Sequence, residues 1–108
     1  MKKNCIFNEL FVLELANNHW GKLSRGLKII KDYGLIVKKN NIKATIKFQF
    51  RDVKKFIHPD YFLNTDHRYV DKTRKTMISW NEMEQMIKEV ANQGMLTMAT
   101  PFDEFSIN

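Results

Sequence analysis

Three short apolar segments, separated by longer amphipathic ones, dominate the pattern of the 108-residue chain. Residues 10–16 are apolar apart from Glu14, and such a run is typical of a strand buried on both faces of a parallel sheet. From residue 22 to 39, apolar residues recur every three to four positions, which predicts a helix with one buried face. That face carries Leu23, Leu27, Ile30, Tyr33 or Gly34, and Val37.

Residues 42–50 alternate between apolar and polar side chains, which predicts a second strand. One face carries Ala44, Ile46, Phe48 and Phe50, and the other carries Lys43, Thr45, Lys47 and Gln49. In a half-exposed antiparallel strand the polar set would simply face water. In a strand-helix-strand unit the polar face is enclosed, so Lys47 and Gln49 need partners. The preceding strand and helix favour this second interpretation.

Residues 51–76 lack a clear period and predict a loop with short helical pieces. Regularity returns at Ser79, which with Glu82 forms a capping box that predicts a helix start. The buried stripe of this helix is predicted to be Trp80, Met83, Met86 or Ile87, and Val90. Gly94 is placed to end the helix in the left-handed conformation. A third strand over 95–100 is stopped by Pro101, and residues 102–104 resemble the start of another helix.

Strand, helix, strand, helix, strand in this order predicts an α/β fold with a parallel sheet. It corresponds to the βαβαβ opening segment of a (β/α)₈ TIM barrel, truncated after the third strand, and we expect residues 1–108 to form a single partial domain. In such barrels the active site lies at the carboxyl ends of the strands. Polar residues collect at those ends here: Asn17 to His19, Lys47 to Gln49, and Thr100.

The composition indicates which kind of ligand the protein binds and in which compartment it is found. The net charge is +6, and the 18 basic residues are spread along the chain rather than clustered. This distribution favours a small phosphorylated anion over nucleic acid as the partner. Cys5 is the only cysteine, which excludes an internal disulfide and fits a reducing compartment. Glu9 and Glu14 interrupt the apolar region that a signal peptide needs, and we expect a cytoplasmic protein without a membrane span.

Three motifs, one at each predicted strand end, carry a resemblance to a known family. Glu14 to Gly21 (ELANNHWG), Ile46 to Gln49 (IKFQ) and Ala99 to Glu104 (ATPFDE) resemble the N-terminal half of the sialic acid (N-acetylneuraminate) synthase family. The resemblance covers nearly all of residues 10–108, and Ile57 to Tyr61 (IHPDY) is similar to one branch of the family.

The resemblance implies a transferase of carbohydrate biosynthesis. Members condense phosphoenolpyruvate with an N-acetylated amino sugar in its open aldehyde form, release phosphate, and use a divalent metal, manganese or magnesium. By resemblance, Lys47 and Thr100 would bind phosphoenolpyruvate, Gln49 would contact the sugar, and Glu14 would be the catalytic residue near the aldehyde. Asn18 and His19 would shape the substrate-binding strand end. A positive charge at Lys47 suits an anion, because charge-assisted hydrogen bonds are strong.

Several departures and alternatives accompany this resemblance. Ala16 stands where the family usually has glycine, and the later strands that supply the metal-binding histidines and the principal acid-base group are missing, so no metal ligand is assigned. We expect the chain to be inactive alone, or completed by a second chain carrying the rest of the barrel. The alternative is a small basic module that binds anions or nucleic acid without catalysis.

Individual residues also have purely structural interpretations. Glu14 could be a buried acid paired with Lys47, and His19 a hydrogen-bonding residue of the strand end. His58, Asp60, Asp66 and His67 lie close together in sequence, but loop histidines more often cap helices or face solvent than bind metal.

Overall fold

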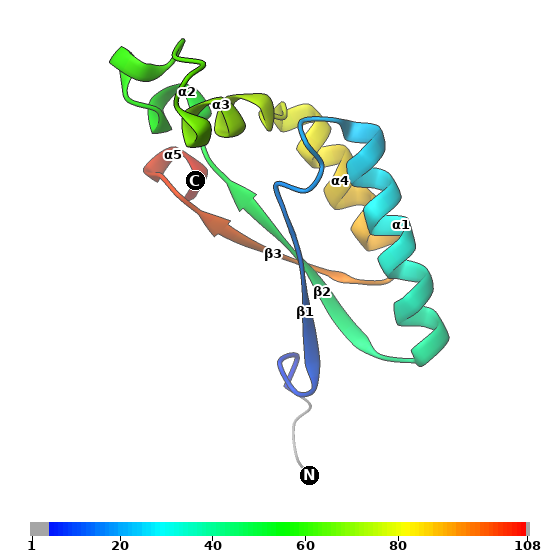
Figure 1. Ribbon diagram of the computed structural model, residues 1–108. Coiled ribbons are helices and arrows are strands. Elements are labelled where there is room, and N and C mark those ends of the chain that lie inside the picture. Colours follow the sequence, from blue (N-terminus) through cyan, green and yellow to red (C-terminus); the bar gives the residue numbers. More distant parts are fainter. Residues whose placement is uncertain (1–4, 108) are drawn as a thin grey trace.

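The computed structural model describes residues 5–107, and it consists of one small sheet, two long helices and an irregular insert (Figure 1). The elements in chain order are β1 (Leu10–Ala16), α1 (Leu23–Asn40), β2 (Lys43–Phe50), α2 (Val53–Phe56), the 3₁₀ turn η1 (Pro59–Tyr61), α3 (Arg68–Lys75), α4 (Trp80–Asn92), β3 (Leu96–Pro101) and α5 (Glu104–Ile107). The predicted order of three strands and two main helices is confirmed.

The three strands are parallel and lie in the order β1-β2-β3. The register pairs Glu14 with Lys47 on β2, and Gln49 with Thr100 on β3. The β1–β2 pairing shifts between Glu14 and Ala16, so Leu15 forms a bulge and Ala16 takes a φ of 48°. Ala16 therefore adopts the left-handed conformation that glycine takes without strain.

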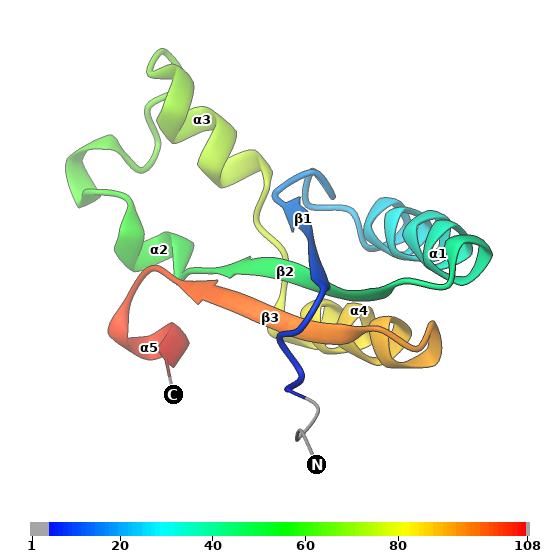
Figure 2. The same cartoon turned by 90° about the horizontal axis from the view of Figure 1, so that it is seen from below.

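Helices α1 and α4 cover one face of the sheet, which we call the helix face (Figure 2). Its core is apolar because alternate residues of each strand point toward the helices. The side chains that are fully buried there include Leu15, Ile30, Ile46, Phe48, Met86 and Val90. The prediction that Ala44, Ile46 and Phe48 share a buried face is confirmed.

Two glycines of α1 lie where this helix meets α4. Gly26 and Gly34 are buried, and a Cβ at Gly26 would collide with the side chain of Met86. At Gly34 it would collide with the side chain of Gln93. The residues that lower helix propensity thus allow the two helices to approach closely.

The helix ends follow the predicted signals. Ser79 and Glu82 form the predicted capping box at the start of α4, with both reciprocal hydrogen bonds present. Gly94 has a φ of 75°, as expected of a residue that ends a helix in the left-handed region. Asn41 takes the same conformation after α1 and donates its N–H to carbonyls of the last turn.

Two burial predictions are wrong. Strand β1 is not buried on both faces, since Phe11 is 53% and Val12 46% exposed. It lies at the edge of the three-stranded sheet, and the helices pack on one face only. Trp80 is 46% exposed and lies at the first turn of α4, where its ring meets Phe50 edge to face at 5.8 Å.

The irregular stretch between β2 and α4 folds as an insert, residues 51–78, beyond the carboxyl end of β2 (Figure 1). It contains the predicted short helical pieces. His58 and His67 each accept a backbone N–H at the start of a helical turn, which confirms the capping interpretation of both residues. A side chain at Gly21 would strike the carbonyls of Lys75 and Met77, so the β1–α1 loop lies directly against this insert.

Within residues 5–107, the structure has no helix long and apolar enough to cross a membrane.

Candidate functional site at the carboxyl ends of the strands

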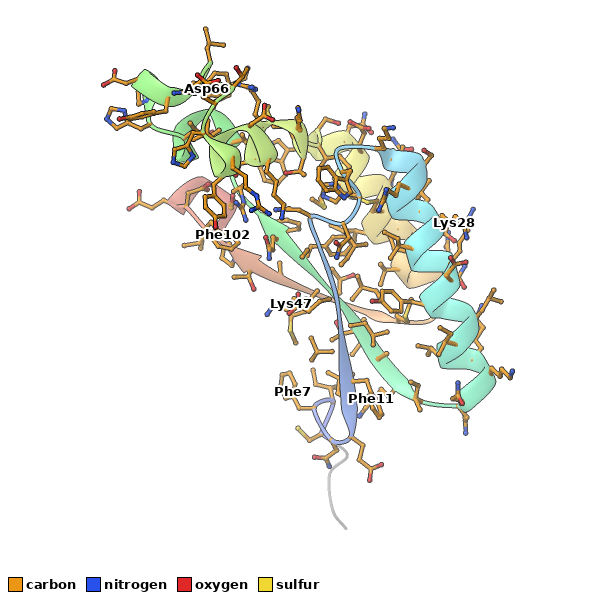
Figure 3. All side chains as sticks on the ribbon, in the orientation of Figure 1. Phe7, Phe11, Lys28, Lys47, Asp66 and Phe102 are labelled. Carbon is orange, nitrogen blue, oxygen red and sulfur yellow. The ribbon has the colours of Figure 1, made fainter. Side chains whose placement is uncertain are left out.

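The face of the sheet opposite the helices carries the predicted site residues, and we call it the polar face. It is defined by Glu14, Lys47, Gln49 and Thr100. Lys47 Nζ lies 3.0 Å from Glu14 Oε1, and the two side chains are 31% and 52% exposed. In Figure 3 the Lys47 side chain points away from α1 and α4. The pairing of Glu14 with Lys47 is therefore present, but Glu14 is not buried.

This ion pair is open to solvent, which matters for what it can do. An exposed pair contributes little to stability, about 0–1 kcal/mol, because both charges remain hydrated. Lys47 can thus turn its ammonium toward an incoming anion without a large loss of folding free energy. Glu14 would then stand beside that anion with an oxygen available to accept or orient a proton.

Gln49 lies on β2 one step nearer the strand end, beside Thr100 in the register. Its side-chain oxygen Oε1 accepts a hydrogen bond of 2.7 Å from Arg51 Nη2. Both Gln49 and Thr100 are partly buried. Glu14, Lys47, Gln49 and Thr100 are therefore brought together on three adjacent strands.

The two predicted residues after β1, Asn18 and His19, differ in burial. Asn18 is exposed at the turn, whereas His19 is only 1% exposed. His19 Nδ1 accepts the Gly21 N–H at 2.9 Å, which leaves the proton of a neutral imidazole on Nε2. His19 thus shapes the β1–α1 turn from within the fold.

Burial also determines the charge of His19. Desolvation lowers the pKa of His19 below 6.5, and the negative charge of Glu82 opposes this shift. The imidazole is therefore held neutral at pH 7. A narrow cavity of about 30 Å³, enough for roughly one water molecule, separates it from Gln49 and Arg51, with Asn17 and Thr76 among the other lining residues.

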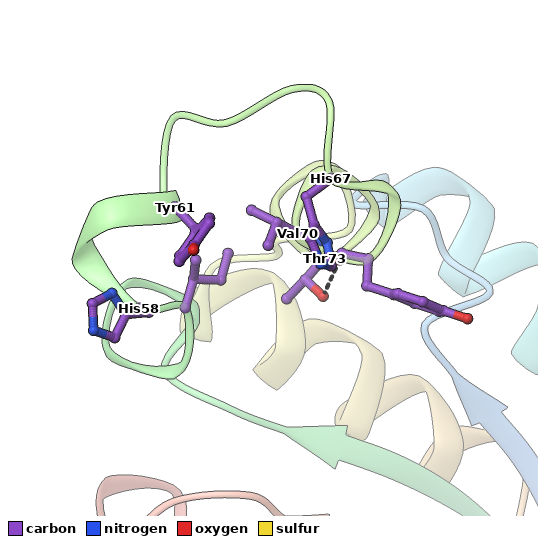
Figure 4. Close-up of a pocket in the computed structure, with 7 residues that line it drawn as sticks. His58, Tyr61, His67, Val70 and Thr73 are labelled. Atoms are coloured by element: carbon purple, nitrogen blue, oxygen red, sulfur yellow. Dashed lines mark hydrogen bonds between the residues drawn. The ribbon is translucent and has the colours of Figure 1, made fainter.

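A second, more open pocket of about 310 Å³ lies in the insert (Figure 4). Its rings follow one another at centroid distances of 5.9 to 6.5 Å, from His58 through Tyr61 and His67 to Tyr69. Val70 and Thr73 of α3 complete the wall shown in Figure 4. This pocket is separate from the polar face.

Comparison with known proteins shows the family to which this chain belongs. A model of the NeuB family matches residues 36–108, more than half of the chain and including Lys47, Gln49 and Thr100. The chain belongs to the NeuB family. A search of curated proteins gives no match.

Two solved structures resemble this NeuB-family chain. A protein from Chromobacterium violaceum ATCC 12472, assigned as spore coat polysaccharide biosynthesis protein E, matches with a TM-score of 0.85 and 29% identity, over 92% of this chain and 30% of that chain. An N-acetylneuraminic acid (sialic acid) synthetase from Leptospira borgpetersenii serovar Hardjo-bovis, in complex with citrate, matches with a TM-score of 0.69 and 20% identity, over 93% and 31%. The chain thus spans about a third of the length of either. The predicted opening segment of a barrel is confirmed.

The metal that the resemblance to the NeuB family implies does not fit the described residues. Within residues 5–107, no group of three or more His, Cys, Asp or Glu side chains is arranged to hold a metal ion. Glu14 is paired with Lys47, and His19 Nδ1 is used by Gly21. We therefore assign no metal ligand and derive no step through a metal.

Arg51 also lies at this end of the sheet, and it is not among the residues predicted from the sequence. Its guanidinium lies over the Phe102 ring, 4.3 Å from the centroid, while it donates to Gln49. A signal was present, because Arg51 lies two residues after Gln49 and side chains at that spacing share a face in an extended chain.

Proposed function

We propose that the polar face belongs to a nonulosonic acid synthase site, in which phosphoenolpyruvate condenses with an N-acetylated amino sugar and phosphate is released. Membership of the NeuB family supports a synthase-like role, and one structural neighbour is itself named a sialic acid synthetase. The observation that carries the proposal is the register that sets Glu14 and Lys47 side by side, with Gln49 and Thr100 one step further along.

In this proposal Lys47 is the anion-binding residue. Phosphoenolpyruvate carries a carboxylate and a phosphate, and an ammonium group can give either of these groups a charge-assisted hydrogen bond, which is the strong kind. Thr100 adds a hydroxyl donor on the neighbouring strand. Lys47 would shift from Glu14 toward the substrate on binding.

Glu14 is proposed as the catalytic group near the sugar aldehyde. Once Lys47 turns to the anion, the Glu14 carboxylate can accept a proton from a water or hydroxyl, or hold that group in place. Gln49 contacts the sugar, Asn18 borders the site from the turn, and His19 fixes that turn from inside. The remaining strands of the barrel, from a longer form of this chain or from a second chain, would complete the site and supply the ligands of a divalent metal.

Calorimetric titration of the 108-residue chain with phosphoenolpyruvate tests the role of Lys47. We expect Lys47→Met to weaken binding at least tenfold, because a hydrogen bond to a charged group is worth about 1.5–3 kcal/mol. Lys43→Met is the matched control: Lys43 lies on the same strand and face, four residues earlier, at the opposite end from the site. It should leave the affinity within about twofold, as expected for a distant exposed charge.

Equal affinity of the wild-type chain and Lys47→Met would overturn the proposal. If both also bind DNA with a steep dependence on salt, a general basic surface explains the binding instead. The condensation itself is measured as phosphate release from phosphoenolpyruvate with N-acetylmannosamine, and we predict none from the 108 residues alone.

A further inference from the structure

The Arg51 side chain joins the ends of two strands. It donates to Gln49 Oε1 at 2.7 Å on β2 and lies over the ring of Phe102, just after β3. The segment after β3 is itself fixed to β2, because the Phe102 N–H donates to the Phe50 carbonyl at 2.9 Å. Arg51 is thus anchored at one end while it holds Gln49 at the other.

Charge strengthens this anchoring. Burial lowers the pKa of Arg51 and the negative charge of Asp103 opposes this lowering. The guanidinium remains charged, because the ordinary pKa of arginine lies far above neutral pH. Asp103 is fixed in turn by the backbone N–H groups of Asp52 and Ser106. The ring, the carboxylate and the amide together define one position for the guanidinium.

Hydrogen-bond chemistry then determines which way the Gln49 amide faces. A guanidinium has only donors, so the amide must turn its oxygen toward Arg51. Within the described part of the chain, Gln49 Nε2 makes no hydrogen bond. The NH₂ group is therefore the edge that Gln49 can offer to a ligand, and it recognises only acceptors.

We propose that Arg51 is a positioning residue that orients the Gln49 amide, so that the end of β2 presents an NH₂ donor to an acceptor oxygen of the substrate, a carbonyl, hydroxyl or carboxylate. The role of Gln49 as a substrate contact rests on the proposed function, whereas the orientation by Arg51 does not. Lysine could not replace Arg51 fully, because it lacks the planar fork that stacks on Phe102 while it donates to Gln49.

Nuclear magnetic resonance of the Gln49 side-chain NH₂ tests the orientation without any ligand. In the wild-type chain we expect an ordered group, and in Arg51→Met an order parameter below about 0.6. Arg51→Lys should restore part of the order. Phe102→Leu, which leaves Arg51 in place but removes its platform, should lower the order less than Arg51→Met does.

Arg74→Met is the control, because Arg74 is a similarly half-buried arginine that donates to Phe62 and Asp71 instead. It should leave the Gln49 signal unchanged, and thermal unfolding of each variant shows that it is folded. A Gln49 group that stays fully ordered in folded Arg51→Met would overturn the proposal. Should Arg51→Met not fold, Arg51→Lys and Phe102→Leu decide in its place, and unchanged order in both would overturn it.

Adding N-acetylmannosamine or phosphoenolpyruvate separates this inference from the proposed function. We expect the Gln49 NH₂ signal to shift in the wild-type chain and at least tenfold more ligand to be needed in Gln49→Glu, which keeps the contact with Arg51 but offers no donor. If neither ligand shifts any signal while the order depends on Arg51, the proposed substrates fail and the positioning role stands.

Discussion

The two faces of the same three-stranded sheet are built for opposite tasks. On the helix face, Ile46 and Phe48 are fully buried against α1 and α4. On the polar face, Lys47 and its partner Glu14 remain partly exposed, although they alternate with those core residues along the strands. Because successive side chains of a strand point to opposite faces, residues that stabilise the fold lie next in sequence to residues that are free to bind a ligand.

The largest effect is expected from truncation on the helix face. Phe48→Ala should lower the free energy of unfolding by about 3–5 kcal/mol, because a fully buried ring leaves a cavity. Its neighbour supplies the control: Lys47→Met should change that free energy by less than about 1 kcal/mol, since it removes an exposed ion pair. Urea denaturation measures both. Similar losses of unfolding free energy from Phe48→Ala and Lys47→Met would show that the polar face contributes as much to stability as the helix face does.

The next effect concerns the contact between the helices on the helix face. Gly26→Ala should destabilise by about 1–3 kcal/mol, because the added methyl group meets the fully buried Met86. Gly34→Ala meets the less buried Gln93, which can turn away, so the gain in helix propensity of about 1 kcal/mol should offset the crowding. Comparing the two urea midpoints checks this, and equal midpoints would contradict the close approach at Gly26.

A smaller effect is expected at the bulge that directly follows Glu14 in β1. Ala16→Gly should stabilise the chain slightly, by up to about 1 kcal/mol. Relief of the left-handed strain at about 1–2 kcal/mol exceeds the entropy cost of glycine of about 0.4–1 kcal/mol. Thermal unfolding measures the change, and clear destabilisation would show that Ala16 does not adopt a positive φ.

The dependence of stability on pH tests the buried His19 of the β1–α1 turn. Its pKa is lowered in the fold, mainly by desolvation, so the unfolded chain binds the proton more readily. Stability should therefore fall as the pH drops below about 6.5, the pKa of a free histidine, and stop falling below the pKa in the fold. His19→Gln should flatten this part of the melting-temperature profile, and an unchanged profile would contradict the role of His19.

The elements could be predicted from the sequence, because their signals are local. The capping box at Ser79, the alternation in β2 and the left-handed Gly94 each depend on a few neighbouring residues. The burial of β1 was predicted wrongly because the degree of burial depends on what packs on each face, and Trp80 was placed in the core for the same reason.

The candidate site residues can be named from the sequence, but their arrangement cannot. The alternation in β2 predicts that Lys47 and Gln49 need partners. It does not identify Arg51 as the partner of Gln49, nor Phe102, 51 residues further along the chain, as the ring against which Arg51 packs. The bulge at Leu15 and the burial of His19 also depend on tertiary contacts. Such contacts cannot be predicted from local periodicity.

The most direct test of the central claim is to find the face of the sheet to which phosphoenolpyruvate binds. Amide chemical-shift mapping of the 108-residue chain during titration should show the largest changes at Glu14, Lys47, Gln49 and Thr100, with the amides of Ile30 and Val90 on the helix face unaffected. Changes confined to the insert pocket around His58 and His67, or spread evenly over the basic surface, would contradict the assignment of the polar face as the substrate site.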